Sequence, residues 1–168
     1  MRASTRVAIC GGGVAAMEAL LALRELLPIH PHIDLIAPNR EFVYQPLAVA
    51  EPFGLARTRL FDVSEIAEEL GAELHVGSLV AVDSSDRCVV LGSGTRLPYD
   101  IAIVAVGARR GKWLEGALSF GGADDVDAFA DLLGRLERGG VSQLAFASPP
   151  GMRWTLPLYE LALLTASR

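Results

Sequence analysis

The segment VAICGGGVAAMEALLALREL, residues 7–26, decides the fold. Apolar residues rich in strand formers lead into three consecutive glycines, and a stretch with helical spacing of apolar residues follows. The pattern predicts a strand over residues 5–10 and a helix over residues 14–27, which Pro28 ends. Because only three of the helical residues are charged, we expect most of the surface of this helix to be buried.

The glycines between these elements match the spacing GxGxxA through Gly11, Gly13 and Ala16. In this pattern the first glycine permits a tight turn, and the second lets the backbone approach a pyrophosphate. The small third residue packs the helix against the strand. The amides of Val14 and Ala15 would then face the phosphates at the positive end of the helix dipole. The pattern therefore predicts nucleotide binding.

Composition agrees with an α/β protein and excludes some partners. Of 168 residues, 51% are hydrophobic, which is typical of a parallel sheet covered on both faces. The formal net charge is −5 and Lys112 is the sole lysine, so nucleic acid is not expected as a partner. No apolar run is long enough for a membrane span and no signal-peptide core is seen, so we expect a cytoplasmic protein.

The remaining chain predicts further strands and helices around one parallel sheet. Residues 37–54 form a long connection, and a connection of this length is usually functional. The most continuously apolar strand, residues 101–108, is expected at the centre of the sheet. The other expected elements are a strand at 32–36, a helix from 62 that ends before Gly71, a strand at 72–77, and an antiparallel hairpin of 80–82 with 88–91.

Two domains are predicted. Residues 1–112 form the first half of a Rossmann-like dinucleotide-binding domain. Residues 113–168 contain a linker helix and the start of a second, degenerate nucleotide-binding domain. Its expected elements are a helix at 126–138 capped by glycines, a strand at 142–147 and a helix at 158–167.

The potential metal-binding and redox side chains form no motif. Cys10 and Cys88 are far apart and make no CxxC, so they are interpreted as small buried residues. His30 and His32 flank a proline, and with His75 alone elsewhere the sequence offers no zinc ligand set. We predict no metal site.

The acidic residue that commonly ends the second strand and binds a ribose is missing, because Ala37 takes its place. Asp34 points to the same face as Ile36 and lies too deep to reach a ribose. Asn39 and Arg40, just past the strand, are better candidates for those hydrogen bonds.

Three segments together resemble a known family. VAICGGGVAAMEA, LIAPNREFVYQPL and LPYDIAIVAVGAR are similar to the N-terminal half of flavoproteins of the pyridine nucleotide-disulfide oxidoreductase superfamily. The similarity is strongest to the branch with sulfide:quinone reductase and type II NADH dehydrogenase, and it covers most of residues 6–109. In that branch the second strand often ends without an acid and runs into an asparagine, an aromatic residue and a proline.

This resemblance implies that FAD is the cofactor and places it residue by residue. Gly11 and Gly13, with the amides of Val14 and Ala15, would hold the pyrophosphate, and Ala16 completes the glycine motif. The other implied contacts are Pro38, Asn39 and Arg40 along the ribose and adenine, Leu79 at the adenine, Pro46 near the isoalloxazine, and Ala105, Val106, Gly107 and Arg109 beneath the cofactor. Val106 stands where the family usually has a threonine.

The later residues depart from the family. Of the second glycine motif that opens the nicotinamide domain of NADH-oxidising members, only Gly151 remains, which disfavours NAD(P)H as the electron donor. No cysteine follows Cys88, so persulfide chemistry has no nucleophile in this region. Tyr159 and Glu160 begin the last helix, where a carboxylate is favoured by the helix dipole. No catalytic residue is assigned.

The sequence predicts the FAD-binding N-terminal portion of a flavin-dependent oxidoreductase, with a small molecule or a quinone as electron partner. The family's second FAD-binding segment lies far downstream. The face that this segment would cover is expected to be apolar and exposed, which favours homo-oligomers. A longer form would allow contact with the membrane periphery. Two alternatives remain open: a non-catalytic Rossmann module that acts through a partner, and an NAD(P)-dependent oxidoreductase.

Overall fold

The structure is a computed structural model that describes residues 5–108, 111 and 114–168. It divides into two compact units. Unit 1 consists of Met1–Phe42 and Leu60–Ala108, and unit 2 of Val43–Arg59 and Arg109–Arg168. The predicted domain boundary at residue 112 remains a prediction, and each unit is described by itself.

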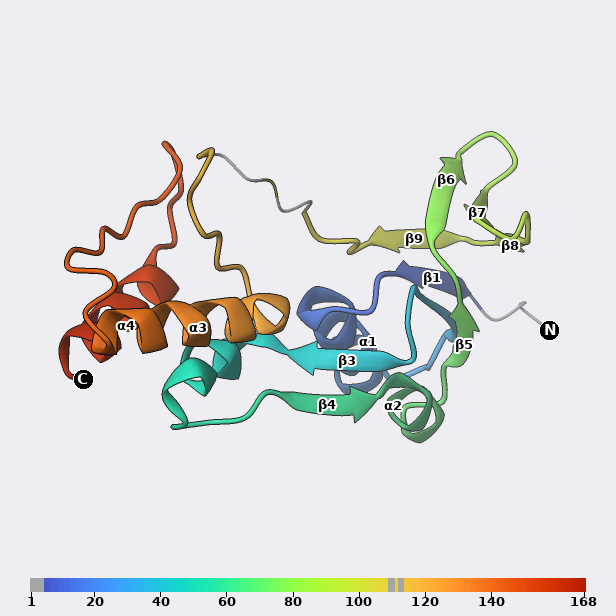
Figure 1. The fold of residues 1–168 in the computed structure, drawn as a ribbon. Coiled ribbons are helices and arrows are strands. Elements are labelled where there is room, and N and C mark those ends of the chain that lie inside the picture. The colour runs from blue at the N-terminus through green and yellow to red at the C-terminus, as the bar shows by residue number, and fades with distance from the viewer. Residues whose placement is uncertain (1–4, 109–110, 112–113) are drawn as a thin grey trace. The chain divides into compact units, whose positions relative to one another are not determined.

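A four-stranded parallel sheet forms the centre of unit 1, as predicted (Figure 1). The strand order is β5-β2-β1-β9. Ala8 lies opposite both Asp34 and Ala102, so the three strands run in register. The strands are β1 (Arg6–Cys10), β2 (His32–Ala37), β5 (Glu73–Val76) and β9 (Ile101–Val104).

The expectation that residues 101–108 form a central strand was wrong. β9 lies at an edge of the sheet that the described residues build, and it is shorter, Ile101–Val104. Ile101 and Val104 are 52% and 56% exposed. A continuous apolar run is typical of a strand with neighbours on both sides, and within the described residues β9 has only β1 as a neighbour.

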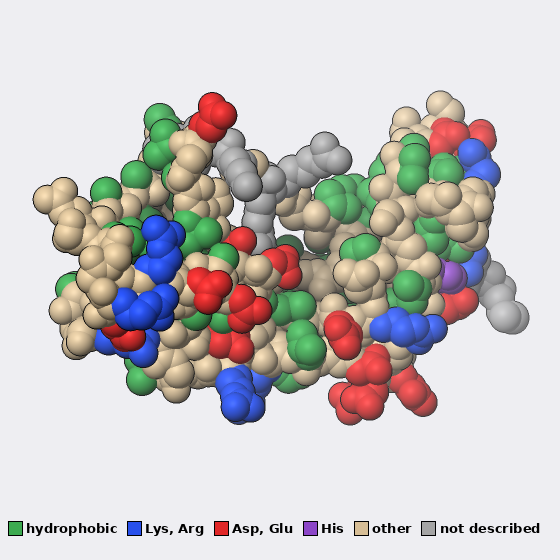
Figure 2. Space-filling view, in the orientation of Figure 1, with side chains coloured by type: hydrophobic (Ala, Val, Ile, Leu, Met, Phe, Trp, Pro, Cys, Tyr) green, Lys and Arg blue, Asp and Glu red, His purple; other side chains and the backbone are tan. Residues whose placement is uncertain are grey.

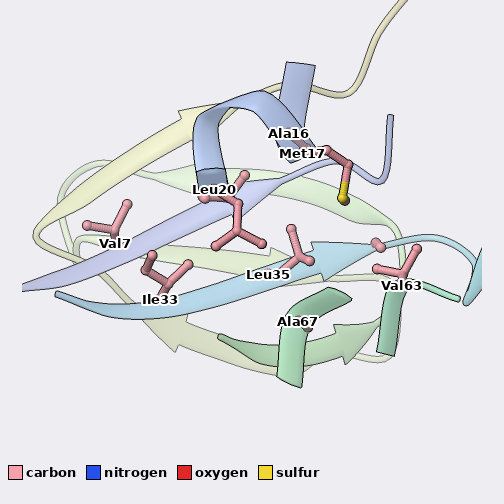
Figure 3. Packing of buried hydrophobic residues seen from close by; sticks show 10 residues of the cluster. Val7, Ala16, Met17, Leu20, Ile33, Leu35, Val63 and Ala67 are labelled. Carbon is pink, nitrogen blue, oxygen red and sulfur yellow. The ribbon is translucent and has the colours of Figure 1, made fainter. Parts of the chain in front are cut away.

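Two helices cover one face of the sheet. α1 (Val14–Leu26) and α2 (Val63–Glu69) pack on alternate residues of β1 and β2, as Figure 3 shows for Leu20 over Val7, Ile33 and Leu35. α1 buries only Ala16, Met17 and Leu20 among the side chains of its 13 residues. The expectation that most of its surface is buried was therefore wrong.

A three-stranded antiparallel sheet packs against the opposite face. It consists of β6 (Leu79–Asp83), β7 (Cys88–Leu91) and β8 (Arg96–Pro98), so the predicted hairpin gains a third strand. Val89 and Leu91 meet Ala8 and Ile36 of the parallel sheet. The parallel sheet is thus covered on both faces, as the composition predicted.

The long connection contains ordered elements. β3 (Glu41–Tyr44) pairs with β4 (Arg59–Asp62), and two 3-10 helices lie between them, η1 (Gln45–Val49) and η2 (Glu51–Phe53). These 3-10 helices belong to unit 2, where η1 contacts α4 (Leu156–Ala166).

Unit 2 is built on aromatic packing. Phe129 of α3 (Val126–Glu137) stacks with Phe53, Phe120 and Phe146. α3 follows the short 3-10 helix η3 (Ala123–Asp125) and is closed by Gly139 at a φ of 73°, as predicted. None of the described helices has the length and apolar character needed to cross a membrane.

The predicted strand at residues 142–147 does not form. These residues are all described, and none of them pairs with a described strand. A short apolar run becomes a strand only when a neighbour completes its backbone hydrogen bonds. Of the predicted second βα unit, the structure therefore shows only the helix, α4.

Replacement of Leu20 by alanine is expected to lower the free energy of unfolding by about 2 to 5 kcal/mol, because the change leaves a cavity beneath α1. Leu20 is fully buried, whereas Leu26 on the same helix is 75% exposed. Leu26→Ala is the matched control and should change stability by less than about 0.5 kcal/mol. Urea unfolding followed by circular dichroism measures both, and equal effects would contradict this packing.

The start of α2 makes stability depend on pH. Asp62 caps the helix by accepting a hydrogen bond from the Ser64 amide at 2.6 Å, which lowers the pKa of its carboxyl group. The stabilisation is complete above the ordinary aspartate pKa and is lost as pH falls through the lower folded value. In the variant Asp62→Asn, the asparagine side chain still caps a helix but does not titrate. The stability difference between wild type and Asp62→Asn should therefore shrink below about pH 4, and a constant difference would contradict the cap.

Candidate nucleotide-binding site

Gly11 follows β1 where three strands meet, and no other residue fits there. Its amide donates to the carbonyl of Ile36 at 2.7 Å. A Cβ at Gly11 would lie 2.1 Å from the carbonyl oxygen of Ala105, and the backbone φ is 145°. Both the contact and the positive φ exclude a side chain, so Gly11 forms the tight turn that the sequence predicted.

Gly13 differs from Gly11 because it faces open space. It is the N-cap of α1, and a Cβ built on it meets no described atom within 4 Å. No side chain caps the helix, and its first turn has no acidic residue. The first amides of a helix have no partner within it, so those of Val14 and Ala15, next to Gly13, are left to bind an external group. Such an arrangement suits an anionic group.

Gly12 makes a close approach that the sequence analysis missed. A Cβ at Gly12 would lie 3.1 Å from the Cβ of Ala37 and 3.5 Å from Cδ of Pro38. The turn after β1 therefore packs closely on the end of β2. The sequence feature that indicated this close packing is the run of three glycines, because the GxGxxA motif accounts for only two of them.

Backbone hydrogen bonds tie the carboxyl ends of the strands together. The Ala105 amide donates to the carbonyl of Cys10 at 2.7 Å, and the Gly77 amide donates to the carbonyl of Ala37 at 2.8 Å. Arg40 follows β2, where its carbonyl accepts from the Val63 amide at 2.8 Å and its guanidinium donates to the Ser64 hydroxyl at 3.1 Å. The edge of the sheet beside the glycine turn is therefore held in place by β1, β2, β5 and β9.

The structure brings most of the predicted site residues to this edge of unit 1. Ala16 is fully buried under the helix, as its place in the motif requires. Leu79 begins β6 just after β5, with its side chain in the core between the two sheets. The residues at the edge are Gly11, Gly13, Val14, Ala15, Ala16, Pro38, Asn39, Arg40, Ala105, Val106 and Gly107.

Besides Leu79, two further predicted residues are not among them. Pro46 lies on η1 in unit 2, so its approach to the flavin stays a prediction. Arg109 lies outside the described residues.

Asp34 lies in the interior of the sheet, as the sequence analysis expected. It is 2% exposed and stands in the middle of β2, whereas Pro38, Asn39 and Arg40 are exposed beyond the strand end. A ribose at the glycine turn would therefore meet Asn39 or Arg40 before it could meet Asp34.

The family profile described as pyridine nucleotide-disulphide oxidoreductase matches residues 5–137. The chain therefore belongs to this family, in agreement with the resemblance seen in the sequence. A search among curated proteins found no match.

Solved structures with a similar fold include two that are named as oxidoreductases. The sulfide:quinone oxidoreductase of Aquifex aeolicus has a TM-score of 0.79 at 21% identity, covering 95% of this chain and 38% of that one. NDH2 of Plasmodium falciparum has a TM-score of 0.61 at 18% identity, over 86% and 32% of the two chains. NADH:rubredoxin oxidoreductase of Clostridium acetobutylicum has a TM-score of 0.59 at 18% identity, over 94% and 42%. The chain thus spans well under half the length of these proteins, and at such identities they show its fold.

Alanine at position 11 and alanine at position 13 should have different effects on the stability of the fold. Gly11→Ala should lower the free energy of unfolding by more than about 3 kcal/mol or prevent folding, because the backbone of Ala105 would have to move. Gly13→Ala should cost less than about 1 kcal/mol, because its Cβ meets open space at a permitted φ of −99°. Urea unfolding of the two variants measures this, and a greater loss for Gly13→Ala would contradict the geometry of the turn.

Proposed function

We propose that this chain is the FAD-binding N-terminal portion of a flavin-dependent oxidoreductase. The observation that carries the proposal is the open space at Gly13, beside an uncapped helix terminus with no acidic side chain in its first turn. A diphosphate would fill that space and accept hydrogen bonds from amides that lack partners within the helix. Membership of the pyridine nucleotide-disulphide oxidoreductase family supports FAD as the particular nucleotide.

The residues at the carboxyl ends of the parallel strands would contact different parts of FAD. Gly11 and Gly13 keep the backbone free of side chains, and the amides of Val14 and Ala15 bind the pyrophosphate. Pro38, Asn39 and Arg40 lie exposed past β2, on the side where the ribose and adenine would extend. Ala105, Val106 and Gly107 follow β9 and would pass beneath the cofactor, while Leu79 would contribute backbone to the adenine.

Bound flavin would supply the hydride or electron transfer, while the protein positions it. The cysteines are not suited to a redox role of their own. Both Cys10 and Cys88 are buried, and burial raises the pKa of the Cys10 thiol, which disfavours the reactive thiolate. We propose a small molecule or a quinone as the electron partner, on the similarity of fold to proteins that include a sulfide:quinone oxidoreductase.

A fluorescence titration of the purified chain with FAD tests this proposal, with NAD as the competing nucleotide. We expect FAD to bind and NAD to bind at least tenfold more weakly. Gly13→Ala should weaken FAD binding about tenfold or more, because its methyl group occupies the space of the pyrophosphate. Gly92→Ala is the control, since its Cβ would make only ordinary contacts, 3.7 Å from Val80.

Three results would contradict the proposal. One is no FAD binding up to about 1 mM, an affinity weaker than about −4 kcal/mol. Another is preferential binding of NAD, which would support an NAD(P)-dependent enzyme instead. The third is an equal effect of Gly13→Ala and Gly92→Ala, which would place the cofactor elsewhere.

A further inference from the structure

A cluster of charged and imidazole side chains lies in the amino-terminal halves of three strands of the parallel sheet, away from the glycine turn. Its members are Arg6 on β1, His32 and Asp34 on β2, and Glu73 and His75 on β5. We call it the charged cluster. Histidine, arginine and carboxylate side chains lie side by side at this end of unit 1 (Figure 2).

Parallel pairing brings these residues together on one face. Arg6 lies opposite His32, and Asp34 lies opposite Glu73. Side chains two residues apart on a strand share a face, so His32 lies beside Asp34 and Glu73 beside His75. This is the face that the antiparallel sheet covers, since Ala8 and Ile36 pack there.

The distances between the side-chain atoms are those of a metal site. His75 Nε2 and His32 Nε2 lie 2.9 and 3.4 Å from Oδ1 of Asp34. His32 Nε2 also lies 3.7 Å from Oε2 of Glu73, and one ligand atom each of His32, Asp34 and Glu73 falls within 4.8 Å of the others. Ligands of a tetrahedral zinc ion at about 2.0 to 2.1 Å are separated by about 3.3 to 3.4 Å. An ion could therefore enter with small side-chain movements.

Arg6 lies beside the nitrogen of His32 that faces the cluster. Nη2 of Arg6 lies 3.3 Å from His32 Nε2. A guanidinium has only N–H donors, so this contact is a hydrogen bond in the tautomer of His32 whose Nε2 carries the lone pair. An imidazole nitrogen in this state is also a metal ligand. The side chain of Arg6 is 41% exposed, so it can move aside toward solvent.

Asp34 is a buried carboxylate with incomplete partners. Its side chain is 2% exposed, and Oδ2 makes no hydrogen bond within the described residues. Arg6 Nε lies 3.3 Å from Oδ2 as an ion pair without hydrogen-bond geometry. A buried charge left in this state is costly unless a cation or further donors complete its surroundings.

We propose that the charged cluster is a binding site for a divalent transition-metal ion of the Zn²⁺ type. The ligands are His32 Nε2 and the carboxylates of Asp34 and Glu73. His75 is a positioning residue that holds Oδ1 of Asp34 through its hydrogen bond. Mixed imidazole and carboxylate ligands suit zinc better than the all-oxygen sites of calcium and magnesium.

Three protein ligands leave one coordination position free. An open surface depression of about 380 Å³, which we call a cavity, adjoins the cluster and is lined by Arg6, His32, Pro98, Tyr99 and Asp100. Water or a small anion could reach the ion from this cavity. The site is distinct from the glycine turn, because Arg6 and Gly11 lie at opposite ends of β1.

Titration of the metal-free chain with Zn²⁺, in competition with a chromophoric chelator, tests the proposal. We expect one ion per chain, and a loss of affinity of about a hundredfold in His32→Ala, which removes a direct ligand. The control is His30→Ala, which should bind Zn²⁺ as the wild type does, because His30 is exposed and makes no contact with the cluster. Glu73→Gln is a second ligand variant whose side chain is 59% exposed, so folding should tolerate it.

Arg6→Gln distinguishes a metal site from a purely structural ion-pair cluster. Removal of a cation that competes for His32 and Asp34 should raise the affinity for Zn²⁺ severalfold, whereas a structural cluster would gain none. Co²⁺ in place of Zn²⁺ should give the visible absorption of a four-coordinate ion. Absence of stoichiometric binding at about 100 μM Zn²⁺, wild-type affinity in His32→Ala, or unchanged affinity in Arg6→Gln would each overturn the proposal.

Discussion

The close approach of Gly11 to the carbonyl of Ala105 is the constraint on which the rest of the site depends. A Cβ at position 11 would lie 2.1 Å from that oxygen. Hydrogen bonds from the Gly11 amide to Ile36 and from the Ala105 amide to Cys10 hold β1, β2 and β9 at this spacing. Because the turn is so tight, α1 begins directly above the sheet edge and presents its first amides to the space at Gly13. The binding geometry is thus set by backbone packing and not by any one polar side chain.

Local signals in the sequence predicted the elements that local forces determine. The helix predicted over residues 14–27 is Val14–Leu26, and the turn residue Gly71 follows α2 at a φ of 63°. Glycine spacing, a proline stop and apolar periodicity each act within a few residues, so one sequence carries enough information to place them. The same holds for the glycine turn, whose two roles at Gly11 and Gly13 follow from where a side chain has no room and where it meets open space.

Features that depend on distant partners could not be predicted in this way. Apolar content suggested a central position for β9 and a strand at residues 142–147, but a strand's place depends on which neighbour supplies its hydrogen bonds. The charged cluster is a further case. His32 and Asp34 are two residues apart, but His75 is 41 residues from Asp34 and reaches it only because β2 pairs with β5. Reading the histidines one at a time gave no reason to connect them.

The two ends of the parallel sheet suit ligands of opposite charge, because all strands of a parallel sheet point the same way. All carboxyl ends of parallel strands share an edge, where helix amino termini gather and anions bind. The amino ends share the other edge, and the amino-terminal halves of β2 and β5 carry Asp34 and Glu73 with two histidines. Asp34 is as deeply buried as Ile36, which shares its face two residues further along β2. Buried ion pairs rarely add stability beyond what an apolar residue would give. Arg6 and His75 supply two partners of this carboxylate, and the proposed metal ion would add a further one.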